Sequence, residues 1–154
     1  MPGLIARGLA SALLVLTSGF ITSAVFAEGR KVSIDDNYVA ISGYDPVAYF
    51  DLGKPTRGEP KFEVVWNEAR WFFASAEHRD MFRQDPERYS PRFGGFCAMG
   101  LALGYLATVD PEVWTVIDGK LYLNHSEKGR ALLHEDIPGA LERAERNWQK
   151  LEEQ

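Results

Sequence analysis

Trp114–Asn124 (WTVIDGKLYLN) is the stretch that decides the fold class. Asp118-Gly119 within it is a two-residue turn signal, because the type I′ turn of a tight hairpin needs positive φ angles at both central residues. This turn pairs apolar residues across the hairpin, Val116 with Leu121 and Trp114 with Leu123. We therefore expect an antiparallel hairpin in which these four side chains face the core.

Working outward from this hairpin, the pattern predicts one more hairpin and two helices. Phe62–Trp66 and Arg70–Phe73 are strand-like runs joined by a short polar turn. Ser75 can cap a helix over Ala76–Arg83. Ile137–Leu151 has an amphipathic helical pattern, whose apolar stripe is Ile137, Leu141, Ala144, Trp148 and Leu151. The predicted fold class is α+β, with a small antiparallel sheet built from hairpins, short helices and an amphipathic C-terminal helix.

Residues 1–27 form a predicted signal peptide. Arg7 is the first charged residue and Glu28 the next, and an apolar run, Leu9–Leu16, lies between them. A basic start, a short apolar region and small residues such as Ala27 before the cut are the parts of an export signal. An uncleaved anchor is the alternative, since about 20 uncharged residues can span a bilayer, but polar residues within the stretch favour cleavage. We expect a periplasmic or secreted protein without a membrane segment after cleavage, in which residues 28–154 form one domain.

The charge balance argues against a nucleic-acid partner. The chain has 17 Lys and Arg residues against 22 Asp and Glu residues, a formal net charge of −5. Binding to nucleic acid depends on Lys and Arg side chains that neutralise phosphates, and the sequence has no basic run. Four tryptophans follow the signal peptide, and so much aromatic bulk indicates a packed core rather than a disordered chain.

Cys97 is the only cysteine, so no disulfide can form within the chain. In an oxidising compartment a lone thiol is buried, bound to a metal ion or open to oxidation. Cys97 lies in Gly94–Gly100 (GGFCAMG), where glycines on both sides allow a close approach of the backbone. Because free cysteine is often a buried apolar residue, a purely structural thiol stays open as an alternative.

Five stretches, which together span most of the chain after the signal peptide, resemble a known family. They are Tyr44–Phe50 (YDPVAYF), Arg70–His78 (RWFFASAEH), Phe82–Tyr89 (FRQDPERY), Arg92–Ala98 (RFGGFCA) and Trp114–Asn124. The first three resemble the YHS domain, and the last two resemble the exported branch of that family. YHS domains accompany metal-transporting ATPases and some oxygenases, and are suspected of binding metal through cysteines, so the resemblance implies a metal-binding domain.

The positions of the family's suspected cysteines differ in this chain. The family pattern has a cysteine after Asp-Pro-Val and a Cys-x3-Cys pair that starts the helix after the aromatic strand. Ala48, Ala74 and His78 stand at these positions here, and of the three only the histidine can bind a metal ion. The resemblance then implies a thiolate-bound metal only if Cys97 replaces the missing cysteines.

These residues lead to the hypothesis of a soft-metal site formed by Cys97 and His78, with Met99 as the third ligand. Thiolate, imidazole and thioether together favour Cu(I), and thiolate and imidazole without methionine suit Zn(II). His78 lies near the start of its predicted helix, where the helix dipole favours a neutral ring that can bind a metal ion. We expect a domain that binds a small ligand rather than an enzyme.

Two other functions stay open from the sequence. A metal-free structural or protein-interaction module would contact an unidentified partner protein through an aromatic surface or through the C-terminal helix. A thiol redox protein would use Cys97 as its reactive group. His125 and His134 have no ligand partner in register and are expected on the surface. Cys97 and His78 within a few ångströms of each other would favour the metal site, and a fully enclosed Cys97 far from both His78 and Met99 would favour the structural module. An exposed Cys97 beside a base or a cation would favour redox chemistry.

Overall fold

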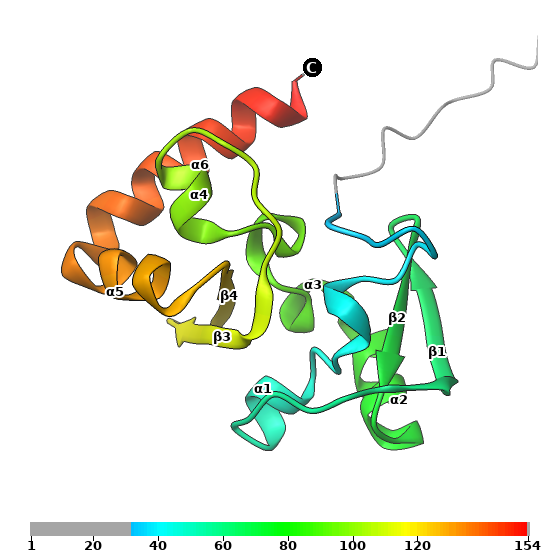
Figure 1. The fold of residues 1–154 in the computed structure, drawn as a ribbon. Coiled ribbons are helices and arrows are strands. Elements are labelled where there is room, and N and C mark those ends of the chain that lie inside the picture. Colours follow the sequence, from blue (N-terminus) through cyan, green and yellow to red (C-terminus); the bar gives the residue numbers. More distant parts are fainter. Residues whose placement is uncertain (1–31, 154) are drawn as a thin grey trace, which may run out of the picture.

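The computed structural model describes residues 32–153, and Figure 1 shows the arrangement of their helices and strands. In chain order the elements are η1 (Ile41–Gly43), α1 (Ala48–Asp51), β1 (Glu59–Trp66), β2 (Ala69–Phe73), α2 (Ala76–Gln84), α3 (Pro86–Tyr89), η2 (Arg92–Gly95), α4 (Ala98–Ala102), β3 (Asp110–Ile117), β4 (Lys120–Asn124), α5 (Glu127–Glu135) and α6 (Ile137–Glu152). The predicted signal peptide, residues 1–27, lies outside the described residues, and its cleavage stays a prediction.

The mixture of helices with two antiparallel hairpins confirms the α+β fold class. Strands β1 and β2 form one two-stranded sheet, and β3 and β4 form another. In Figure 1, β1, β2 and α2 lie on one side of the molecule, and α4, α5 and α6 lie on the other. None of the helices formed by residues 32–153 combines the length and the apolar character that crossing a membrane requires.

The register of the β3–β4 hairpin is the predicted one. Val116 pairs with Leu121 and Trp114 with Leu123, and both residues of the Asp118-Gly119 turn have positive φ angles, 50° and 72°. Leu121 and Leu123 are fully buried, but Val116 is 37% exposed. The prediction that Val116 faces the core is therefore wrong. Near the turn, β3 borders a shallow hollow against α5 instead of the core.

The buried apolar side chains form two clusters. We call the first the N-terminal core; its members are Ala40, Ile41, Tyr44, Val47, Tyr49, Ala69, Trp71, Phe73, Phe82, Tyr89, Leu121 and Leu123. We call the second the C-terminal core; its members are Phe93, Cys97, Ala98, Met99, Leu101, Ala102, Tyr122, Leu133, Ala140, Ala144 and Trp148.

Strand β4 contributes to both cores. Its side chains alternate between the two faces, as they do in any strand, so Leu121 and Leu123 lie in the N-terminal core while Tyr122 lies in the C-terminal core. Asn124, the last residue of β4, is also buried. The strand therefore lies between the two clusters, with both of its faces covered.

Both predicted helices are present, whereas the Asp-Pro pairs of the sequence begin different kinds of element. Ser75 caps α2 by accepting a hydrogen bond from the main chain of His78, and α6 covers the predicted range with Ala144 and Trp148 buried. Asp85-Pro86 begins α3, because an aspartate can cap a helix and proline suits its first position. Asp110-Pro111 instead begins β3, where the Asp110 carboxylate accepts a hydrogen bond from the main-chain N–H of Glu112 and forms a local turn.

Candidate functional site

Cys97 lies between a tight turn and a short helix. The three residues Phe93, Gly94 and Gly95 all have positive φ angles, and the chain then enters α4 with Cys97 as the capping residue. A Cβ atom on Gly95 would lie 3.2 Å from the Ile41 side chain, and the φ of 82° at this position disfavours any other residue. The turn directs the Cys97 thiol into the C-terminal core, where it is buried.

The Cys97 sulfur is surrounded by hydrogen-bonding groups. The main-chain N–H groups of Gly100 and His125 each donate to Sγ at 3.3 Å, and the thiol donates to Oδ1 of Asn124 at 3.8 Å. The sulfur therefore accepts two main-chain hydrogen bonds and lies beside the oxygen of a buried amide.

Asn124 links the thiol to Met99. Its Oδ1 also accepts a hydrogen bond from the main-chain N–H of Met99 at 3.2 Å, whereas its side-chain nitrogen is buried with no hydrogen-bond partner among residues 32–153. Cys97 and Met99 line the same cavity, which has a volume of about 420 Å³. We call it the Cys97 pocket; its lining is Cys97, Met99, Gly100, Leu103, Tyr105, Ala107, His125, Ser126, Lys128, Gly129 and Leu132. The structure therefore brings two of the three predicted ligands together.

His125 is the histidine that the structure brings to the thiol. Its main chain contacts the Cys97 sulfur, and its ring Nδ1 lies 3.0 Å from the carbonyl oxygen of Thr108. A carbonyl can only accept, so Nδ1 donates this hydrogen bond, and in the neutral form of the ring the lone pair lies on Nε2. Metal-binding histidines typically have this arrangement, with one nitrogen donating to a carbonyl and the other free for the metal. His125 is exposed, as expected, but no local pattern in the sequence connects it with Cys97.

His78, the second predicted ligand, lies elsewhere. Figure 1 shows α2, which carries His78, on the opposite side of the molecule from α4. Its Nδ1 lies 2.6 Å from the buried Asp45 carboxylate, and its Nε2 lies 3.1 Å from the carboxylate of Asp51. Both ring nitrogens are therefore engaged, and His78 is not among the residues that line the Cys97 pocket.

The electrostatic surroundings of His78 also differ from the expectation. Burial disfavours the charged ring, but the hydrogen bonds and negative charges of Asp45 and Asp51 outweigh burial and raise the pKa of His78 above its ordinary value. This direction runs against the expectation that the helix dipole keeps the ring neutral, because two carboxylates at hydrogen-bond distance act more strongly than the partial charge at a helix end. A ring that donates from both nitrogens has no lone pair for a metal ion.

The positions that the resemblance aligns with the family's cysteines do meet in space. The carboxylate of Asp45 accepts hydrogen bonds from the main-chain N–H groups of Ala48 and Ala74, at 3.3 and 2.8 Å, as well as contacting the ring of His78. In this chain a buried carboxylate and a histidine thus occupy the centre of that cluster. The cluster binds the start of α1 to the end of β2 and to α2.

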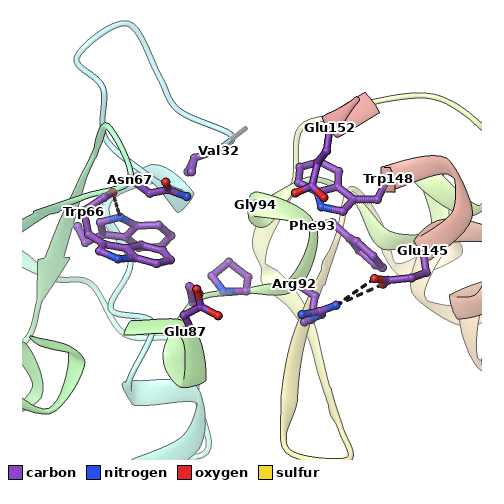
Figure 2. Close-up of a pocket in the computed structure, with 13 residues that line it drawn as sticks. Val32, Trp66, Asn67, Glu87, Arg92, Phe93, Gly94, Glu145, Trp148 and Glu152 are labelled. Carbon is purple, nitrogen blue, oxygen red and sulfur yellow. Dashed lines mark hydrogen bonds and ion pairs between the residues drawn. The ribbon is translucent and has the colours of Figure 1, made fainter. Parts of the chain in front are cut away.

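A cleft between the β1–β2 turn and α6 is a further cavity, with a volume of about 250 Å³. Figure 2 shows Trp66 on one side of it and Trp148 on the other, with Arg92 paired to Glu145. The Nη2–carboxylate distance of that pair is 3.3 Å, and Nε of Arg92 is buried with no hydrogen-bond partner among the described residues. No Cys, His or Met lines this cleft, so it offers no soft donor to a metal ion.

Within residues 32–153, no group of three or more His, Cys, Asp and Glu side chains is arranged to hold a metal ion. A site built on Cys97 therefore depends on the thioether of Met99 as a donor beside the thiol and the imidazole of His125. Neither a protein-family model, nor a curated protein, nor a solved structure matches this chain.

Proposed function

We propose that this chain is an exported domain that binds a soft metal ion, Cu(I), in the Cys97 pocket. The observation that carries the proposal is the hydrogen bond from the main-chain N–H of His125 to Sγ of Cys97. It puts the main chain of His125 in contact with the only thiol of the sequence, and both His125 and Met99 line the same pocket as Cys97. His125 takes the place of His78 in the ligand set.

The chemistry of these donors favours Cu(I) over harder ions. Thiolate and thioether are soft ligands that select Cu(I), and imidazole binds it as well. None of the residues that line the pocket is acidic, and carboxylates are the ligands that harder ions such as Mg²⁺ and Ca²⁺ require. The YHS resemblance points in the same direction, although this chain would use a different set of residues from the family's suspected cysteines.

The test is anaerobic titration of the reduced, metal-free protein with Cu(I) in the presence of a competing chelator. We expect one Cu(I) per chain, with binding that weakens as the pH falls, because the thiol and the imidazole must both be deprotonated to bind. Cys97→Ser should abolish binding, His125→Ala should weaken it about 10- to 100-fold, and Met99→Leu should have a smaller effect.

Two other histidines provide matched controls. His134→Ala removes an exposed ring that contacts Thr115 rather than the Cys97 pocket, and His78→Gln removes the ring of the original hypothesis. Both variants should keep the wild-type affinity. No Cu(I) uptake, together with a Cys97 thiol that resists alkylation until the protein is denatured, would instead identify a structural core thiol.

A further inference from the structure

The Cys97 pocket is far larger than a metal ion needs. A bound ion lies about 2.0–2.3 Å from its ligand atoms, whereas this cavity has a volume of about 420 Å³. That volume falls within the range of about 300–1,000 Å³ found for small-molecule pockets. Beyond the candidate metal ligands at its inner end, the pocket has room for an organic molecule.

The outer wall of the pocket is apolar and open to solvent. Leu103 is 59% exposed, Tyr105 is 55% exposed and Leu132 is 37% exposed, and all three line the pocket. Single exposed apolar residues are common on protein surfaces, but several gathered around one cavity typically mark a binding site. The wall therefore suits a ligand with an apolar body.

The charge of the pocket is opposite to that of the chain. The whole chain has a net charge of −5, yet no acidic residue lines the pocket, and Lys128 is one of its lining residues. The nearest acid in sequence, Glu127, pairs with Arg130 at 2.7 Å, so this carboxylate is directed to another cation. An anionic group on the ligand would therefore meet Lys128 without a competing carboxylate in the lining.

Gly129 is a second, independent indication that the volume of the Cys97 pocket is kept free for a ligand. This glycine lies inside α5, where alanine stabilises a helix better than glycine does. A Cβ atom there would lie 3.6–4.0 Å from Ser126, Met99 and Asn124, which is ordinary contact distance. Packing therefore does not require glycine at this position. A side chain at residue 129 would instead occupy part of the pocket.

From these features we infer that the Cys97 pocket binds a small organic anion with an apolar body, of the class of medium-chain carboxylates. The carboxylate would contact Lys128, and the hydrocarbon chain would lie against Leu103, Tyr105 and Leu132. This inference goes beyond the proposed metal site and does not depend on it, because the residues of the outer wall differ from the candidate metal ligands.

The test is calorimetric titration of the metal-free protein with octanoate, and with octylammonium as a cation of the same apolar length. We expect saturable binding of one octanoate, and octylammonium about tenfold weaker or worse, a preference worth about 1.4 kcal/mol. Gly129→Leu should fill the pocket and reduce octanoate affinity at least about tenfold, while its thermal stability equals or exceeds that of the wild type. Lys128→Met should remove the preference for the anion over the cation.

Controls separate this inference from the metal proposal and from general charge effects. Lys120→Met removes a cation from the β3–β4 hairpin, away from the pocket, and should leave octanoate binding unchanged. Lys128→Met should keep the Cu(I) affinity, because a lysine ammonium group does not bind a metal ion. Failure of one proposal can therefore be seen independently of the other. The inference would be overturned if octanoate does not bind, if Gly129→Leu binds it as well as wild type, or if the protein binds only vesicles of phosphatidylglycerol.

Discussion

The carboxylate of Asp45 joins three segments that are distant in the sequence. It accepts main-chain hydrogen bonds from Val47 at the start of α1 and from Ala74 at the end of β2, and it contacts the ring of His78 in α2 at 2.6 Å. The carboxylate is fully buried, and a buried charge is tolerated only when partners of this kind compensate its lost hydration. A single residue thus fixes the position of α1 against the N-terminal core.

We predict that Asp45→Ala lowers the free energy of unfolding by about 3–5 kcal/mol, because it leaves the partners of a buried charge without their acceptor. Denaturant unfolding measures this. Asp51→Ala is the matched control: this carboxylate contacts the same ring but is 49% exposed, so its loss should cost no more than about 1 kcal/mol. Equal losses in the two variants would contradict the role given to Asp45.

The contact between His78 and the two carboxylates also predicts how stability depends on pH. The folded protein has a pKa for His78 above the ordinary value of 6.5, so the folded state binds a proton more tightly than the unfolded state. This contribution to stability is fully present below about pH 6.5 and is lost as the pH rises through the raised pKa. Unfolding measured from pH 6 to 9 should therefore show a fall in stability that His78→Gln lacks. If His78→Gln shows the same fall in stability, the fall belongs to another titratable group.

The residues of the candidate site could be predicted from the sequence only in part. Cys97 and Met99 are two positions apart, so their proximity follows from local geometry, and both line one pocket. His125 is far from Cys97 in the sequence and reaches it only because β4 ends beside α4, which no local pattern reveals. Asp45 has the sequence pattern of a helix start, and its second role, pairing with His78, is a tertiary contact.

At the scale of single elements, the β3–β4 hairpin gives a prediction with its own control. Leu121 is fully buried, while its cross-strand partner Val116 is 37% exposed. Leu121→Ala should lower the free energy of unfolding by about 2–5 kcal/mol, as for other large-to-small core substitutions. Val116→Ala should change it by only about 0.5 kcal/mol, as for surface positions. Similar melting temperatures for Leu121→Ala and the wild type would show that the strand is not a core element.

Elements with strong local signals were predictable, and those without them were not. The Asp118-Gly119 turn and the apolar stripe of Ile137–Glu152 are sufficient to locate the second hairpin and α6. Helix α4, Ala98–Ala102, is only five residues long and almost entirely buried, so it has no amphipathic pattern. Helix α5 begins with a capping Ser126 but carries an interior glycine, which weakens its helical signal. Burial and packing, rather than local propensity, specify these two helices.

At the scale of the whole molecule, the first prediction concerns export. The apolar stretch after Arg7 is interrupted by polar residues and ends in small ones, which favours cleavage after Ala27 over retention as an anchor. The intact mass of the exported protein should therefore match residues 28–154. A mass matching the full chain, or a membrane-bound form that resists a high-salt wash, would show an uncleaved anchor instead.

The last prediction concerns cooperativity between the two cores. Leu121 and Leu123 of β4 lie in the N-terminal core and Tyr122 lies in the C-terminal core, so neither core can lose β4 without exposing the other. Two units that share a buried strand should unfold together, as small single domains usually do. Native-state hydrogen exchange should then give the same opening free energy for amides of β2 and of α4, apart from residues that open locally at lower cost. Leu123→Ala should lower both values equally, although its side chain belongs to the N-terminal core. A variant in which the amides of β2 lose protection while those of α4 keep it would show that the cores are independent folding units.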